Sequence, residues 1–77
     1  MTTAHTYKII ELVGTSHEGI EQAIKGAVDR ASQTLKALDW FDVKEVRGQI
    51  KDGKVEWYQV KIAIGFRVLD PRDLHRE

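Results

Sequence analysis

Residues 40–68 read WFDVKEVRGQIKDGKVEWYQVKIAIGFRV, and this stretch decides the fold. Asp52-Gly53 separates two strand-like segments, residues 40–50 and 54–68. Both turn positions tolerate a positive φ, as a two-residue hairpin turn requires. The stretch therefore predicts an antiparallel β-hairpin, and so short a turn fixes the register by placing Lys51 opposite Lys54.

A strand and a helix are predicted before the hairpin. Residues 6–13, TYKIIELV, suit a strand that ends at Gly14. The segment TSHE at residues 15–18 fits a capping box, with either Thr15 or Ser16 as the N-cap. Apolar residues then recur at three- and four-residue steps, as in one amphipathic helix. They are Ile20, Ala23, Ile24, Ala27, Val28, Ala31, Leu35 and Leu38.

The order of elements predicts the fold class. A β-α-β-β order with a terminal hairpin is most simply an α+β fold, in which one helix packs on a three-stranded antiparallel sheet. The 77 residues show no repeat and no linker. We therefore expect residues 1–77 to form a single domain, with residues 71–77 as a flexible tail.

The small size of the chain points to self-association. A domain of this length buries little more than half of its unfolded surface, and such domains often depend on disulfides, a metal or partner subunits. The chain has no cysteine, which excludes disulfides and thiolate metal sites. Its three histidines are scattered, so we expect no metal site. Assembly with further copies is the remaining source of stability.

The charge balance limits the classes of partner. Twelve basic residues offset twelve acidic ones, and no basic stripe of the kind found in nucleic-acid binders is visible. No apolar run approaches the length of a membrane span, and the first residues contain no signal-peptide hydrophobic segment. We expect a cytoplasmic protein without nucleic-acid or membrane partners.

The hairpin register assigns side chains to two faces of the sheet. One face, which should cover the helix, is predicted to carry Phe41, Val43, Tyr58, Val60, Ile62, Ile64, Phe66 and Val68. The opposite face is predicted to carry Trp40, Val46, Ile50, Val55, Trp57 and Ala63 among polar residues. One helix covers only one side, so the second face is a candidate for subunit contact, ligand contact or both.

Trp40 is the most informative residue on this second face. The predicted register places Gly65 opposite Trp40, which leaves the indole without a side-chain partner on its own subunit. A planar aromatic ligand could stack on an open indole. The alternative is an aromatic residue that only fills a core or an interface, which is also our interpretation of Trp57.

Several segments of the chain resemble the dodecins, small bacterial and archaeal flavoproteins. They are VGTS at residues 13–16, ALDW at 37–40, EVRG at 45–48 and YQV at 58–60. The resemblance covers roughly residues 7–68, and the segments follow one another in the family's order. It implies a β-α-β-β fold whose three-stranded antiparallel sheet wraps around the one helix. It also implies a hollow particle of twelve copies that binds flavins in pairs between subunits, for storage, buffering or photoprotection rather than catalysis.

The resemblance also implies ligand-binding residues. The family tryptophan matches Trp40 and stacks on the isoalloxazine ring, and the family glutamine matches Gln59 and hydrogen-bonds its polar edge. In members that bind FMN, arginines that match Arg47 and Arg67 lie near the phosphate. Riboflavin is the alternative flavin, and some bacterial members also bind coenzyme A. The residue types fit, because a primary amide both donates and accepts and a guanidinium holds phosphate through forked hydrogen bonds.

The register adds an inference about the site. Gln59 is expected opposite Val46, six residues along the strand from Trp40, or roughly 20 Å. One flavin ring cannot span that distance, so we hypothesise that the Trp40 and Gln59 that serve one ligand come from different subunits, unless a bulge intervenes. Alternation places Arg67 on the same face of the sheet as Trp40 and Gln59, which is consistent with a shared site. An ion pair between subunits is the alternative role for Arg67. Strict alternation places Arg47 on the opposite face. Either a β-bulge intervenes, or Arg47 acts at an edge of the sheet, or its role is structural.

Two other functions remain as alternatives. A particle that binds another ligand, such as coenzyme A, or nothing would assemble without a flavin. An enzyme is not expected, because acid–base chemistry needs a positioned histidine or a carboxylate pair. Asp39 and Asp42 point to opposite faces by alternation.

Overall fold

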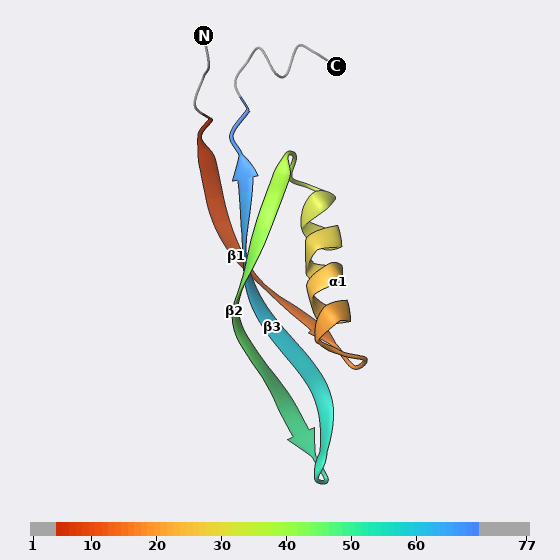
Figure 1. Cartoon of the computed structure of the whole chain (residues 1–77). Helices are drawn as coiled ribbons and strands as arrows, with labels where there is room; N and C mark the ends of the chain where they lie inside the picture. The colour runs from red at the N-terminus through yellow and green to blue at the C-terminus, as the bar shows by residue number, and fades with distance from the viewer. Residues whose placement is uncertain (1–4, 70–77) are drawn as a thin grey trace.

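The computed structural model describes residues 5–69 as one helix against one sheet (Figure 1). The elements are β1 (Tyr7–Ser16), α1 (Ile20–Ser32), β2 (Leu38–Lys51) and β3 (Lys54–Arg67). The three strands form an antiparallel sheet with β3 between β1 and β2. The predicted α+β fold is confirmed. The tail predicted for residues 71–77 lies outside the described residues.

The hairpin turn is as predicted. Asp52 and Gly53 both have a positive φ, 54° and 76°, and Lys51 pairs with Lys54. This conformation matches the right-handed twist of the strands that it joins. From this turn β2 and β3 pair as far as Leu38 and Phe66, with interruptions at register shifts.

The register between β2 and β3 shifts at three places, and two of these shifts lie between the turn and Trp40. Between the turn and Gln49 the pairing moves by one residue, and between Glu45 and Val43 it moves back. A bulge sets two residues of one strand against one of its partner and increases the local twist. The two shifts compensate, so Trp40 lies opposite Gly65 as predicted.

Inside the shifted segment the predicted pairs are wrong. Gln59 pairs with Arg47 and not with Val46, which pairs with the buried Val60. Alternation along β2 places Ile50 on the same side as Val46, and Val55 pairs with Ile50. These three residues therefore lie on the helix side of the sheet, contrary to the prediction. We call them the hairpin cluster.

The first strand runs past Gly14, which was expected to end it. Gly14 is buried and pairs with Val60. A Cβ at this position would lie 3.0 Å from the Ala23 carbonyl carbon and closer still to its oxygen. The glycine therefore lets the backbone of α1 cross directly over β1, where any side chain would hold the two apart.

The helix starts later than the capping-box prediction. Gly19 is the N-cap and makes no side-chain cap. The Ser16 hydroxyl oxygen instead accepts hydrogen bonds from the backbone N–H groups of Glu18 (2.9 Å) and Gly19 (3.4 Å), which orders the loop. Neither predicted N-cap is correct, because β1 continues through Ser16 and the loop needs three residues to turn.

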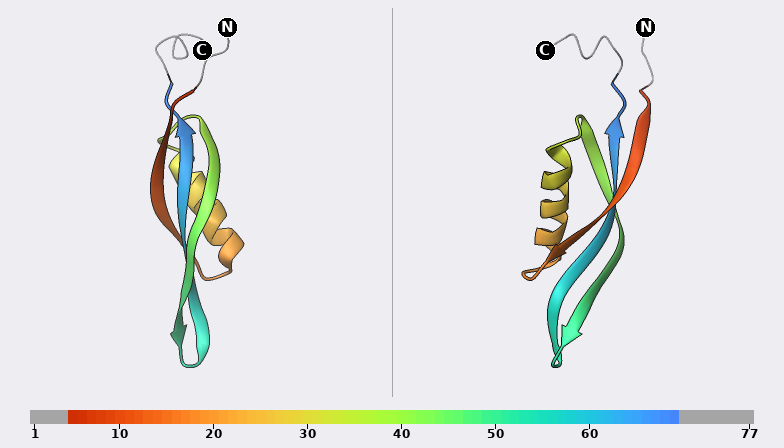
Figure 2. Two further views of the ribbon diagram at one scale, coloured as in Figure 1. Left: turned by 60° about the vertical axis from the view of Figure 1, so that its left-hand side comes forward. Right: turned by 180° about the vertical axis from the view of Figure 1, so that it is seen from behind.

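The core lies between the alanine side of α1 and the centre of β3. Its buried members are Ala23, Ala27, Ala31, Val60, Ile62 and Ile64. A helix of 13 residues is about 20 Å long, whereas strands of 14 residues span about 46 Å. The helix therefore covers less than half of the hairpin, whose turn end extends beyond it in both further views (Figure 2).

Candidate ligand-binding face

Trp40 lies on the face of the sheet that α1 leaves uncovered. Its ring lies over Gly65 of β3, where a Cβ would be 2.5 Å from the indole Cη2 and closer to two other ring atoms. The ring also meets Tyr7 of β1, with centroids 5.1 Å apart and planes tilted by 55°. Gly65 therefore provides the space in which the indole lies across the central strand.

Trp40 is neither buried nor free of contacts. About 40% of its surface is exposed. The prediction that it has no side-chain partner on its own subunit is wrong, because Tyr7 is such a partner. Tyr7 was missed because the register between β1 and β3 is set by no short turn. Gly65 and Tyr7 hold the indole ring in place, and the exposed part of the ring is available to a planar ligand.

Arg67 lies at the same end of the face. It pairs with Tyr7 and follows Gly65 by two residues, roughly 7 Å along β3. Alternation along β3 therefore places Arg67 on the same face as Trp40, one same-face position beyond Gly65. We call Tyr7, Trp40, Gly65 and Arg67 the stacking half-site.

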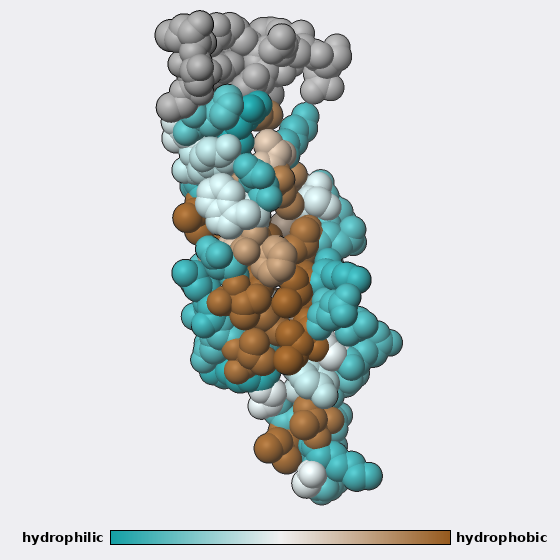
Figure 3. All heavy atoms as spheres, in the orientation of Figure 1, coloured by the Kyte–Doolittle hydropathy of each residue, from teal (hydrophilic) through white to brown (hydrophobic). Residues whose placement is uncertain are grey.

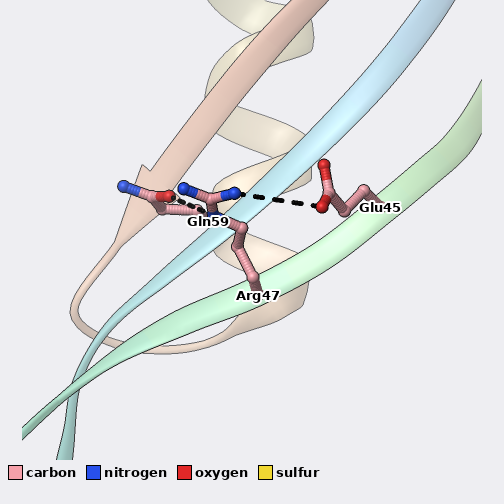
Figure 4. A network of polar contacts seen from close by, with 3 residues as sticks. All are labelled: Glu45, Arg47 and Gln59. Atoms are coloured by element: carbon pink, nitrogen blue, oxygen red, sulfur yellow. Dashed lines mark hydrogen bonds and ion pairs between the residues drawn. The ribbon is translucent and has the colours of Figure 1, made fainter.

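Gln59 and Arg47 form a second polar group farther along the same face (Figure 4). The register shift places them opposite each other, and Arg47 Nε donates a hydrogen bond to Gln59 Oε1 at 3.3 Å. Arg47 Nη1 also lies 3.9 Å from Glu45 Oε2. The bulge that the sequence analysis left open therefore exists and puts Arg47 on the face of Gln59. We call Glu45, Arg47 and Gln59 the amide half-site.

A shallow depression accompanies the amide half-site. It has a volume of about 210 Å³ and is lined by Val13, Glu45, Arg47, Gln59 and Lys61. Two cationic side chains and one carboxylate surround it, so its local charge favours a ligand that is anionic or carries electronegative oxygens.

The two half-sites are far apart in one chain. Trp40 lies opposite Gly65, and Gln59 precedes Gly65 by six residues on β3. At about 3.3 Å per residue this separation is roughly 20 Å, and the bulge does not change it. One chain therefore offers two separate half-sites, and the hypothesis that different subunits complete one site stays a prediction.

Trp57 has a local partner that the sequence did not indicate. The His17 ring lies over it, with centroids 3.7 Å apart and planes tilted by 34°. His17 Nδ1 lies 3.0 Å from the Glu56 carbonyl oxygen, which fixes the imidazole in this position. The two tryptophans thus differ, because the Trp57 ring lies close against the His17 imidazole, whereas the Trp40 ring meets Tyr7 at a larger centroid distance and a steeper tilt.

An apolar groove lies on the other face, between α1 and β2. Its volume is about 780 Å³, and its apolar walls are Ile20, Ile24, Val28 and Phe41. Figure 3 shows apolar surface gathered on this face of the molecule. On its rim Lys25 Nζ lies 2.8 Å from Glu21 Oε2. The hydrogen bond lowers the pKa of Glu21 and raises the pKa of Lys25. We call this the helix groove.

Residues 5–69 contain neither a candidate metal-binding cluster nor a helix that could span a membrane. In that range no group of three or more histidine, cysteine, aspartate or glutamate side chains could hold a metal ion. In the same range no helix is long and apolar enough to cross a membrane.

Comparisons with known proteins give one consistent result. The sequence model of the dodecin family matches residues 6–69. The dodecin of Thermus thermophilus is 56% identical over 62 residues, which are 80% of this chain and 90% of that protein.

Solved structures agree with the sequence comparison. The dodecin from Streptomyces coelicolor is 54% identical, with a TM-score of 0.85 over 90% of this chain and 99% of that chain. The dodecin from Streptomyces davaonensis is 51% identical, with a TM-score of 0.85 over 88% of this chain and 100% of that chain.

Proposed function

This chain belongs to the dodecin family, and we propose that it binds and stores flavin, as FMN or riboflavin, in a hollow homododecamer. The flavin ring stacks on Trp40 between subunits. The protein performs no reaction on the flavin and works in the cytoplasm. Binding keeps the flavin out of free solution and returns it unchanged.

The observation that carries the proposal is the position of the Trp40 ring. An indole lying over a glycine and against Tyr7 is held before any ligand arrives, so ligand stacking costs little additional ordering. Its exposed part offers a rigid aromatic surface, which suits the fused rings of a flavin.

Polar groups on the same face supply the rest of a flavin site. The amide of Gln59 suits the oxygen- and nitrogen-bearing edge of the ring, and the guanidinium groups of Arg47 and Arg67 suit the phosphate of FMN. Since the two half-sites of one chain lie roughly 20 Å apart, the Gln59 that completes a site comes from another copy.

The uncovered apolar surface favours self-assembly. The hairpin cluster, Val46, Ile50 and Val55, is 47%, 73% and 54% exposed. Ile50 and Val55 pair with each other close to the hairpin turn, Val46 pairs with the buried Val60, and the helix groove is also open. Monomeric proteins rarely expose large contiguous apolar patches to solvent. The formal net charge of zero leaves little repulsion between copies.

Titration of riboflavin into the Trp40→Ala particle tests the proposal. Stacking on one aromatic ring is worth about 1–3 kcal/mol, so the variant should bind riboflavin at least about fivefold more weakly and quench its fluorescence less. Trp57→Phe is the matched control, because Trp57 is covered by His17 and should contribute neither effect.

The same titration separates the alternatives. Unchanged affinity and quenching in Trp40→Ala would show that the proposed site is wrong. An assembled wild-type particle that takes up no flavin would instead favour the second function, a particle that binds another ligand such as coenzyme A.

A further inference from the structure

Lys61 lies in the depression beside the amide half-site, and we propose that it makes this site prefer a phosphorylated flavin, FMN, over riboflavin. Lys61 is a specificity-determining residue whose ammonium group pairs with the flavin phosphate. Riboflavin has no phosphate and leaves this contact unused. The proposal rests on the proposed flavin function and names the flavin that the site selects.

The strand register places Lys61 next to Gln59. Lys61 follows Gln59 by two residues on β3, roughly 7 Å along the strand, so alternation puts both side chains on the uncovered face. Val13 of β1 and Glu45 of β2 pair with Lys61 from its two sides. Together with Arg47 these residues line the depression of about 210 Å³. Lys61 and the Gln59 amide therefore belong to one site.

The charge of Lys61 has no partner within residues 5–69. Glu45 is directly opposite Lys61, yet its carboxylate forms an ion pair with Arg47, with 3.9 Å between Oε2 and Nη1 (Figure 4). In the described part of the chain no hydrogen bond or ion pair engages the Lys61 side chain. The lysine is also half-buried, which reduces its contact with water. An anionic ligand group suits this ammonium, since hydrogen bonds between ionised groups are stronger than those between neutral groups.

The balance of charge around the depression favours a phosphate. Arg47 and Lys61 bring two positive charges and Glu45 brings one negative charge, so one positive charge remains. A phosphate monoester carries a charge of about −1.5 to −2 at pH 7, whereas riboflavin is neutral. Lys61 therefore supplies the excess positive charge that attracts the phosphate.

The covalent structure of FMN brings its phosphate near the same edge of the ring. The polar edge of a flavin is its pyrimidine ring, which suits the Gln59 amide. The ribityl chain leaves the ring system at N10, on the side of N1 and the C2 carbonyl, and carries the phosphate on its last carbon. A flavin whose polar edge meets Gln59 therefore holds its phosphate within a five-carbon chain of that side, and Lys61 is the nearest cation along β3 on this face.

The ratio of the dissociation constants of riboflavin and FMN measures this preference. Both constants are obtained by fluorescence titration of the assembled protein at low ionic strength, where screening is weakest. Stacking on Trp40 is common to both flavins and cancels in the ratio. The wild type should bind FMN at least about threefold more tightly than riboflavin.

Two substitutions should move the ratio in opposite directions. Lys61→Gln removes the positive charge and should lower the preference for FMN by roughly two- to fivefold. Glu45→Gln removes the opposing carboxylate and should raise the preference by a similar factor. The affinity for riboflavin should change little in both variants, because riboflavin carries no charge.

Lys54→Gln is the matched control. It makes the same change of charge on the same strand, but Lys54 lies next to the turn, seven residues or roughly 23 Å from Lys61. Its ratio should equal the wild-type ratio. Lys61→Arg keeps the charge and should keep most of the preference for FMN.

The proposal is overturned if the wild type binds both flavins equally, if Lys61→Gln keeps the wild-type ratio, or if Lys54→Gln lowers the ratio as much as Lys61→Gln does. Should Lys61→Gln fail to assemble, Glu45→Gln decides, and a ratio that does not rise contradicts the proposal. All of these results leave the proposed function intact, because riboflavin still binds. If the wild type binds neither flavin, the proposed function fails and this proposal fails with it.

Discussion

Gly65→Ala is the substitution that most sharply tests how the Trp40 ring is held. Gly65 is buried beneath the indole, and an added Cβ would lie 2.5 Å from Cη2, with two further ring atoms closer. Ordinary van der Waals contact begins near 3.4 Å, so the ring must move by about 1 Å or more. Trp40 is partly exposed and can move, so the sheet itself should remain intact.

The expected effect is on ligand binding rather than on folding. A displaced indole loses its contact with Tyr7, and aromatic pairs of this kind are worth about 0.5–1.5 kcal/mol. It also loses part of its stacking on the flavin. We expect riboflavin to bind about five- to tenfold more weakly, near 1 kcal/mol, in a fluorescence titration.

Gly26→Ala is the matched control. A Cβ at Gly26, inside α1, meets no atom within 4 Å. The change should leave riboflavin affinity unchanged and stabilise the helix by up to about 1 kcal/mol. The reasoning is refuted if Gly65→Ala binds riboflavin like wild type and the near-ultraviolet circular dichroism of its indole is unchanged.

Three further substitutions test the scaffold. Gly14→Ala sets a Cβ against the backbone of α1 and should lower the free energy of unfolding by about 3 kcal/mol; an unchanged urea midpoint would contradict the close crossing. In Gly53→Ala the alanine must adopt a φ of 76°, so the free energy of unfolding should fall by about 1 kcal/mol in the same measurement. An unchanged free energy of unfolding would contradict the positive φ at this position. His17→Ala uncovers Trp57, so the fluorescence emission of Trp57 should shift to longer wavelength. The emission is recorded in a background in which Trp40 is replaced by phenylalanine, and an unchanged wavelength would show that the two rings do not stack.

The parts of the fold that could be predicted are those set by local chemistry. Asp52-Gly53 defines the turn because few residue pairs accept two positive φ angles, and the turn then aligns its neighbours. Trp40 could be placed opposite Gly65 by counting from the turn, although only because two bulges cancel between them.

The parts that could not be predicted depend on long-range geometry. Strict alternation put Arg47 and Gln59 on opposite faces, whereas a bulge between the turn and this pair shifts the register by one residue and makes them direct partners. The crossing of α1 over Gly14 and the contact of Tyr7 with Trp40 need the register between β1 and β3. No short turn joins these strands, so no local pattern encodes it.

Mass spectrometry of the intact particle, sprayed from native buffer after incubation with riboflavin, tests the central claim most directly. The account predicts one assembly of twelve chains that carries riboflavin, and a loss of the bound riboflavin when Trp40 is replaced by alanine. A monomer, or a dodecamer that carries no riboflavin in the wild-type protein, would contradict it.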